Sequence, residues 1–277
     1  MNNSMITASV SMGALQQKLD IIADNFANSN TVGYKRKSAT FEDILTSLNP
    51  QIDDFNQQGR KTPLGLTLGW GARLSSIRTD LAQGSLQHTG EMTDIAIEGN
   101  GMFEVRTNGV IGGPRAFTRH GPFHLIPDAT NGGRLLTTNS GQLVVADTGN
   151  GDDFVRVPNG YELRIAEDGT MTGVIGDGTD PIALGRLKVV QVANADLLRA
   201  IDDNLFGIPE NVDPLNVVRD VPVQGSISVR QGFVEQSNVN MADEMADLMI
   251  VQRAYQLSAR ALTSSEQMMG MANNLRG

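Results

Sequence analysis

Apolar residues recur every three or four positions along the first 26 residues of the chain. The spacing alternates between three and four, and the members of this seam are Met5, Ala8, Met12, Leu15, Leu19, Ile22 and Phe26. This pattern is typical of a helix that packs against another helix. Ser4 is the expected N-cap, and the run Asn28–Gly33 is expected to end the helix. We therefore predict an N-terminal helix of about 24 residues.

The C-terminal segment carries two apolar stripes at the same spacing. The first stripe consists of Ile250, Ala254, Leu257, Ala261, Ser264, Met268, Met271 and Leu275. The second stripe consists of Leu248, Val251, Tyr255, Leu262 and Met269. Asn240, with Asp243 three residues later, is the expected N-cap. One N-terminal helix covers only one stripe, so we expect an intramolecular helix pair and further helices from other copies of the chain. The methionines suit such an interface, although core packing alone also explains them.

The centre of the chain is rich in residues that form turns. All 10 prolines and all but four of the 30 glycines lie between residues 41 and 232. Strand candidates lie among these turns, at residues 94–98, 102–106, 115–119, 135–138, 142–146, 163–166, 171–174 and 187–191. Asn108-Gly109 and Asp168-Gly169 are hairpin-turn signals, and residues 194–201 suit a short helical turn.

These patterns predict an α+β fold. Long N- and C-terminal helices form a coiled-coil-like pair, and the central domain is mainly antiparallel β-structure. We expect a discontinuous helical assembly domain at residues 1–40 and 235–277 and a connecting region at 41–80 and 222–234. The central β-rich domain is expected at residues 81–221.

Composition and charge narrow the functional classes. The chain has no cysteine and three histidines, and 22 basic residues against 31 acidic residues give a net charge of −9. These counts argue against thiolate chemistry, neutral-pH acid–base catalysis and general nucleic-acid binding. No apolar run approaches the roughly 18 residues of a membrane span, so membrane insertion is not expected. We expect no enzymatic activity and no cofactor.

Three local patterns are weak candidates for chemistry. Gly99-Asn-Gly101 lacks the third glycine of a dinucleotide-binding loop, so a turn is the better interpretation. His120, His124 and Asp128 have metal-ligand side chains, but the proline between the two histidines favours a bend that separates them. The basic run 35–37 is expected to be a solvated or acid-paired patch.

Four blocks of sequence, taken in order, resemble those of bacterial flagellar rod and hook proteins. They span Leu15–Arg36 with Phe41–Leu45 after it, Asp94–Val105 with Phe117–Phe123, Val229–Asn240, and Gln252–Tyr255. The resemblance runs the length of the chain. It implies a basal-body rod subunit that is exported through the flagellar type III apparatus without signal cleavage, and that acts outside the cytoplasm. It also implies a hollow helical assembly with coiled terminal helices inside and the β domain outside.

Within this family the chain is more similar to the distal-rod type than to the proximal-rod type. The segments that carry this similarity are Ser237–Asn240, Gln252–Tyr255 and Pro63–Arg73. His120 and the long stretch Gly109–Arg115 depart from the distal pattern. The expected function is therefore a distal-rod subunit that transmits torque, with a proximal-rod or hook-type axial protein as the alternative.

The seams and the resemblance together define the expected sites. The expected partners are other copies of the chain in a helical rod, other rod proteins, the hook protein and the export apparatus, but not nucleic acid. Phe41 and Leu45 belong to the expected export-related segment. The expected assembly interface consists of Met12, Leu15, Leu19, Ile22, Phe26, Leu248, Val251, Tyr255, Leu257, Leu262 and Met268.

Overall fold

The computed structural model describes residues 2–49, 66–128, 132–149, 151–176, 181–202, 204–209, 211–220 and 227–275. The chain forms two compact units. Unit 1 consists of Met1–Phe26, Lys37–Arg78 and Asn240–Gly277. Unit 2 consists of Ala27–Arg36 and Thr79–Val239. The domain boundaries expected from composition stay a prediction.

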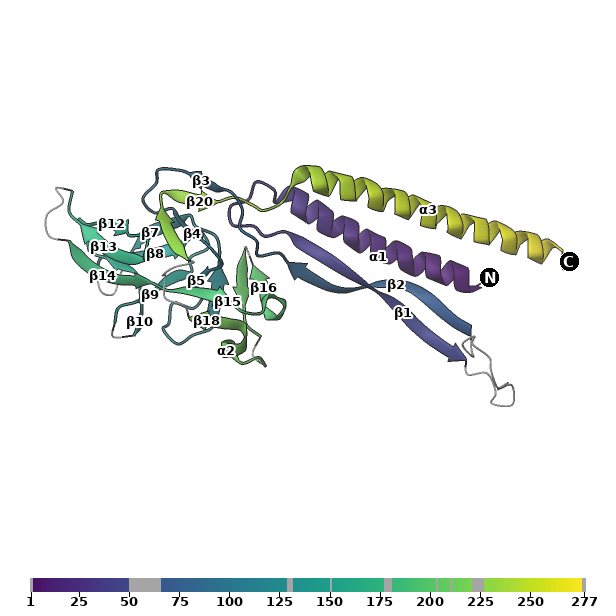
Figure 1. The fold of residues 1–277 in the computed structure, drawn as a ribbon, viewed down its shortest axis with the longest axis horizontal. Coiled ribbons are helices and arrows are strands. Elements are labelled where there is room, and N and C mark those ends of the chain that lie inside the picture. Colours follow the sequence, from purple (N-terminus) through teal and green to yellow (C-terminus); the bar gives the residue numbers. More distant parts are fainter. Residues whose placement is uncertain are drawn as a thin grey trace, which may run out of the picture. The chain divides into compact units, whose positions relative to one another are not determined.

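Unit 1 contains two long helices and a pair of long strands. Helix α1 spans Asn2–Ala27 and helix α3 spans Met241–Asn274, while strands β1 (Lys37–Asn49) and β2 (Leu66–Thr79) pair with each other. The helices run antiparallel and side by side, and the β1–β2 pair lies along α1 (Figure 1). The expected pairing of long terminal helices is thereby confirmed. Neither helix is long and apolar enough to span a membrane.

The helix ends show how far cap residues can be identified from sequence. Asn240 caps α3 as expected, because its Oδ1 accepts a hydrogen bond from the backbone N–H of Ala242 at 3.0 Å. Ser4 is not the cap of α1, since that helix already begins at Asn2. The helix ends at Ala27, directly before the expected run, in which Thr31 N–H donates to the Asn28 carbonyl and Gly33 has a φ of 71°.

Unit 2 is built from short strands, and every pairing with a known register is antiparallel. The first strands are β3 (Leu86–His88), β4 (Ile95–Glu98), β5 (Met102–Arg106), β6 (Arg115–Thr118), β7 (Phe123–Pro127), β8 (Arg134–Thr138), β9 (Leu143–Asp147), β10 (Asp152–Phe154) and β11 (Arg156–Val157). The next are β12 (Glu162–Ile165), β13 (Thr170–Val174), β14 (Ile182–Leu187), β15 (Val189–Val192), β16 (Arg199–Asp202) and β17 (Leu205–Gly207). The 3-10 turn η2 (Ala195–Leu197), helix α2 (Pro214–Val217), β18 (Val218–Asp220), β19 (Ser228–Gln231) and β20 (Phe233–Glu235) complete the unit.

One large sheet organises these strands. Its main path runs β12-β13-β14-β9-β5-β6-β17-β16. Two smaller pairs, β19 with β4 and β20 with β3, bring the C-terminal end of unit 2 beside its beginning. The expected mainly antiparallel central domain is thereby confirmed.

Strand β5 is buried on both faces, so it divides the core of unit 2 into two clusters. Phe103 and Val105 belong to the larger cluster, in which the Phe103 ring meets Phe123 edge-on at 5.2 Å. Met102 points the other way, into a smaller cluster with Phe117. Because side chains alternate along a strand, Glu104 shares the face of Met102. A carboxylate is therefore placed inside the fold and requires charged partners there.

One turn prediction and one strand prediction are wrong. Asn108-Gly109 does not form a two-residue hairpin, because residues 107–114 all lie between β5 and β6; Arg106 holds this longer loop by donating to the Gly113 carbonyl at 2.5 Å. The strand expected at 187–191 divides at Lys188, where β14 ends its pairing with β9 and β15 begins pairing with β5. The Asp168-Gly169 hairpin turn between β12 and β13 is present as predicted.

Candidate assembly interface and its buried junctions

Helix α3 presents one of its two apolar stripes to α1. One set of covered positions repeats at intervals of four and three, and its members are Glu244, Leu248, Val251, Tyr255, Ser258, Leu262, Ser265 and Met269. Three residues beside this set, Asp247, Ala254 and Ala259, are also partly covered. This set contains the whole second stripe. The intramolecular seam is therefore the second stripe, and every member of the first stripe except Ala254 is exposed.

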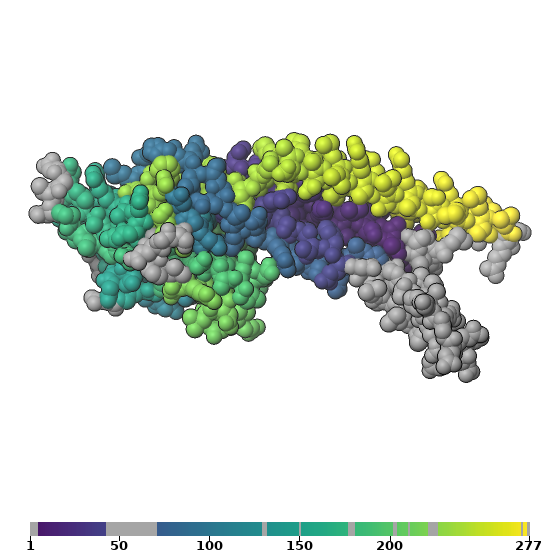
Figure 2. All heavy atoms as spheres, viewed as in Figure 1, coloured from purple at the N-terminus to yellow at the C-terminus, as the bar shows by residue number. Residues whose placement is uncertain are grey.

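Five large residues of the first stripe and three methionines make up a surface that we call the exposed stripe. Its residues, each at least 43% exposed, are Met241, Met245, Met249, Ile250, Leu257, Met268, Met271 and Leu275. In the space-filling view, α3 lies at the surface of unit 1 along its length (Figure 2). An apolar surface of this extent is uncommon on a chain that remains alone.

The residues expected at the assembly interface divide between these two surfaces. Leu257 and Met268 lie on the exposed stripe. On α1, Phe26 is exposed and Ile22 is buried, whereas Met12, Leu15 and Leu19 are partly covered. The remaining four, Leu248, Val251, Tyr255 and Leu262, belong to the intramolecular seam. Their role in assembly stays a prediction.

A polar contact inside unit 1 joins the C-terminal end of α1 to the N-terminal end of α3. The Asn25 amide exchanges two hydrogen bonds with the backbone of Lys37, at 2.8 and 2.9 Å, as a neighbouring strand would. Its Nδ2 also donates to the Glu244 carboxylate at 3.3 Å. One buried amide thus joins α1, β1 and α3. Sequence analysis missed Asn25, because it lies outside the apolar seam.

The expected export-related segment lies on β1. The Phe41 ring packs beneath the Lys18 ammonium, whose nitrogen is 5.8 Å from the ring centroid. Leu45 follows on the same strand, and its side chain lies outside the described part of the chain. The segment Pro63–Arg73 likewise begins outside the described residues.

Glu235, the last residue of β20, is the centre of a buried ionic junction in unit 2. Its Oε1 accepts from Lys35 Nζ at 2.8 Å and from the Gly84 N–H at 2.7 Å, and its Oε2 accepts from Arg119 Nε at 2.6 Å. The three charged residues are each at most 3% exposed. We call Lys35, Arg119 and Glu235 the ionic junction.

Backbone carbonyls complete the hydrogen bonding of the two cations. Arg119 donates to the carbonyls of Gly101, Gly99 and Ile97, at 2.6, 2.7 and 3.1 Å. Lys35 donates to the carbonyl of Ala82 at 2.7 Å. Two cations share one carboxylate, and burial of Lys35 outweighs the attraction of Glu235, so the pKa of Lys35 is lowered. The turn at Gly99-Asn-Gly101 therefore supplies carbonyls to an arginine.

A second buried carboxylate lies in the sheet. Glu104 is fully buried and receives a two-pronged contact from Arg115, with Nε at 3.1 Å and Nη2 at 2.7 Å from its two oxygens. Arg106 approaches at 2.8 Å and Lys188 at 3.5 Å. Although burial opposes it, hydrogen bonding to Glu104 raises the pKa of Arg115. This cluster explains how β5 tolerates a carboxylate on a buried face.

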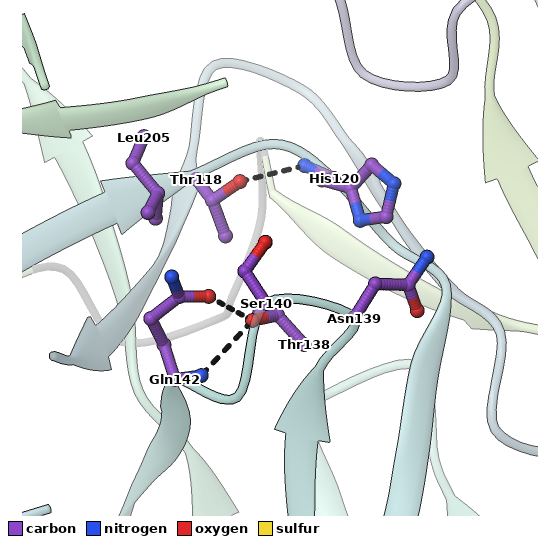
Figure 3. A pocket seen from close by; sticks show the side chains of 7 residues that line it. All are labelled: Thr118, His120, Thr138, Asn139, Ser140, Gln142 and Leu205. Atoms are coloured by element: carbon purple, nitrogen blue, oxygen red, sulfur yellow. Dashed lines mark hydrogen bonds between the residues drawn. The ribbon is translucent and has the colours of Figure 1, made fainter. Parts of the chain in front are cut away.

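Of the two candidate histidine ligands, one borders a small pocket and the other is exposed on a strand. His120 borders a pocket with Thr118, Thr138, Asn139, Ser140, Gln142 and Leu205, and its volume of about 10 Å³ suits a single water molecule (Figure 3). The His120 N–H donates to Thr118 Oγ1 at 3.0 Å. His124 is exposed on β7. Across the described ranges, no three histidine, aspartate or glutamate side chains group as metal ligands would.

Comparison with known proteins identifies both ends of the chain. The family model described as "Flagella basal body rod protein" matches residues 5–35, and "Flagellar basal body rod FlgEFG protein C-terminal" matches residues 230–275. These matches contain Lys35 and Glu235 but not Arg119. Burial of these charges was not foreseen, because charged residues are almost always exposed unless they are paired.

Relatives match the chain over its whole length. The flagellar hook-basal body complex protein FlhP of Bacillus subtilis is 37% identical and covers 100% of both chains. The flagellar basal-body rod protein FlgG of Borreliella burgdorferi is 31% identical and covers 100% of this chain and 99% of its own. FlgG of Bacillus subtilis is 29% identical, with 100% of both chains covered.

Proposed function

Because this chain belongs to the flagellar basal-body rod protein family, we propose that it is a subunit of the distal rod that transmits torque from motor to hook. The family is one of structural axial proteins, and the chain is a non-enzymatic component of the flagellar basal body. Six relatives that carry the name FlgG are 29–32% identical to the chain over at least 95% of its length, and they support the distal-rod assignment.

The observation that carries the proposal is the exposed stripe of α3. Leu257 is 64% exposed in a helix whose opposite stripe is already paired with α1. Copies of the chain that stack helically would cover the exposed stripe with helices of neighbouring subunits. Interdigitated helices resist relative rotation, which is what a shaft under torque requires.

The same assignment supplies the other expected partners. The subunit would contact further copies of itself, other rod proteins and the hook protein. It would cross the cell envelope through the flagellar export apparatus, with the segment at Phe41 and Leu45 contributing to export. In this proposal the chain works outside the cytoplasm and needs no cofactor.

One observation favours a second candidate function. Within Bacillus subtilis, FlhP is 37% identical to the chain and FlgG 29% identical, both over their full lengths. This difference favours a hook-basal body complex protein of the FlhP kind, in a position on the axis other than the FlgG distal rod. Both candidates share the helix pair and the exposed stripe, so only their place along the axis separates them.

Electron microscopy of basal bodies from a strain that lacks the gene tests the proposal. The distal-rod assignment predicts that the distal shaft is absent while the export apparatus remains. A complete rod that ends without a hook would contradict it and favour a hook-type protein. A strain with the full-length gene restored controls for effects on neighbouring genes, and one truncated after Asn240 should fail to restore the shaft.

A further inference from the structure

The chain passes between its two units four times. The crossings lie at residues 26–27, 36–37, 78–79 and 239–240. Three segments of unit 2 lead directly to these crossings, and we call them the N-terminal segment (27–36), the middle segment (79–85) and the C-terminal segment (233–239). They come from the beginning, the first third and the end of the sequence, so nothing in chain connectivity holds them together.

Backbone hydrogen bonds join the three segments to one another. Gly33 N–H donates to the Glu235 carbonyl at 2.8 Å, and Asp80 N–H donates to the Arg36 carbonyl at 2.8 Å. Gln236 N–H donates to the Ser85 carbonyl at 2.9 Å. Each segment is therefore bonded to both of the others.

One asparagine side chain repeats this arrangement. Asn238 Oδ1 accepts from the Arg36 N–H at 2.7 Å, while its Nδ2 donates to the carbonyls of Asp80 and Ala82 at 2.9 and 3.0 Å. The amide of the C-terminal segment thus bridges the other two segments. All three of these hydrogen bonds are made with backbone groups, and those groups belong to residues close to a crossing or to the ionic junction.

The ionic junction adds charge to the same place. Glu235 of the C-terminal segment binds Lys35 of the N-terminal segment and the Gly84 N–H of the middle segment. Arg119, which follows β6, binds the other carboxylate oxygen and so connects the three segments to the main sheet. If one segment leaves, buried charges and backbone groups in the other two lose their partners, which is costly inside a fold.

The backbone packs closely against two glycines of these segments. A Cβ on Gly84 would lie 2.0 Å from the Gln236 carbonyl oxygen. A Cβ on Gly33 would lie 2.8 Å from the backbone of His120, at a φ that already favours glycine. The middle and C-terminal segments are therefore in close backbone contact at Gly84, and the N-terminal segment is in close backbone contact with His120 at Gly33.

We propose that the ionic junction, centred on Glu235, makes the N-terminal, middle and C-terminal segments open and close as one cooperative unit. A displacement that arrives along one chain crossing is then shared by the other segments. The alternative is that each segment docks on the sheet separately and opens with its own free energy. The proposal does not depend on the position of the chain along the flagellar axis.

Native-state hydrogen exchange of the full chain, followed by mass spectrometry at low urea concentrations, separates these alternatives. Cooperative opening predicts that peptides from 27–36, 79–85 and 233–239 exchange with one opening free energy and one urea dependence. Peptides from β5 and β6 provide the reference for global unfolding. If the opening constants of the three peptides differ by more than about tenfold, the proposal is overturned.

Lys35→Met tests the junction directly, and Lys37→Met is the matched control. Lys37 is also acid-paired, with Asp24 at 2.8 Å, but the pair lies in unit 1 and is partly exposed. We expect Lys35→Met to accelerate exchange in all three segments by a similar factor, roughly tenfold or more, and Lys37→Met to leave them unchanged. Acceleration confined to 27–36 would contradict cooperative opening. The wild-type measurement decides the question even if Lys35→Met fails to fold.

Discussion

Replacing Leu257 by aspartate separates the stability of one subunit from the stability of the assembly. Leu257 lies on the exposed stripe with 64% of its surface accessible. Full burial of a leucine side chain is worth about 1.5–3 kcal/mol. About two-thirds of that, or about 1–2 kcal/mol, therefore remains to be gained when a neighbouring helix covers the side chain.

Aspartate forgoes this gain and adds a larger cost. A carboxylate that enters a helix interface without a partner loses its hydration, at an effective cost of several kcal/mol. In the single subunit the same side chain stays in water, so the free energy of unfolding should change by no more than about 1 kcal/mol. The variant should therefore fold normally and fail to assemble.

Urea unfolding followed by circular dichroism gives the subunit stability, and sedimentation with electron microscopy of rods gives the assembly. Leu215→Asp is the control, because it makes the same substitution at a leucine of unit 2 that is 77% exposed and lies outside the exposed stripe. We expect the control to assemble. Normal rods from Leu257→Asp would refute the reasoning, as would a loss of several kcal/mol in the isolated subunit.

Three further predictions concern the stability contributed by residues of unit 2. Gly33→Ala should lower the free energy of unfolding by about 1–3 kcal/mol in urea titrations, because φ is +71° and the new Cβ would meet the His120 backbone at 2.8 Å. Glu104→Gln should cost about 1.5–3 kcal/mol by the same measurement, since Arg115, Arg106 and Lys188 lose their fully buried anion and keep only Asp220 and Asp152; a change below about 0.5 kcal/mol would contradict the assigned contacts. The lowered pKa of Lys35 means that the unfolded chain binds more protons just below pH 10.5, so stability from this group should rise with pH there, and Lys35→Met should lose that rise.

The terminal helices and the central strands were predictable because their packing follows the periodicity of the sequence. A three–four spacing selects a helix and a two-residue alternation selects a strand. Periodicity could not decide which stripe of α3 faces α1, since both stripes repeat at the same interval. That choice depends on which side chains fit α1 and on Asn25, which binds Glu244 at the end of the seam.

Other features depend on contacts between distant residues. Strands β1 and β2 were not among the strand candidates, and Gly71 lies where β2 approaches α1: a Cβ there would lie 3.1 Å from the Thr7 carbonyl oxygen. Acid pairing was one of two expectations for the basic run 35–37, and the Lys35–Glu235 pair confirms it. The identity of the partners could not be predicted, because Lys35, Arg119 and Glu235 meet only after folding. Taken singly, lysine, arginine and glutamate are residue types that usually lie on the surface.

Cysteine labelling tests most directly whether the exposed stripe is the surface buried between copies. The chain has no cysteine, so single cysteines at Leu257, Met271 and the control position Leu215 of unit 2 can be compared by maleimide reactivity in free subunits and in assembled rods. The account predicts that cysteines at Leu257 and Met271 react in the free subunit and become protected in rods. Stripe cysteines that stay as reactive in rods as in free subunits would contradict it.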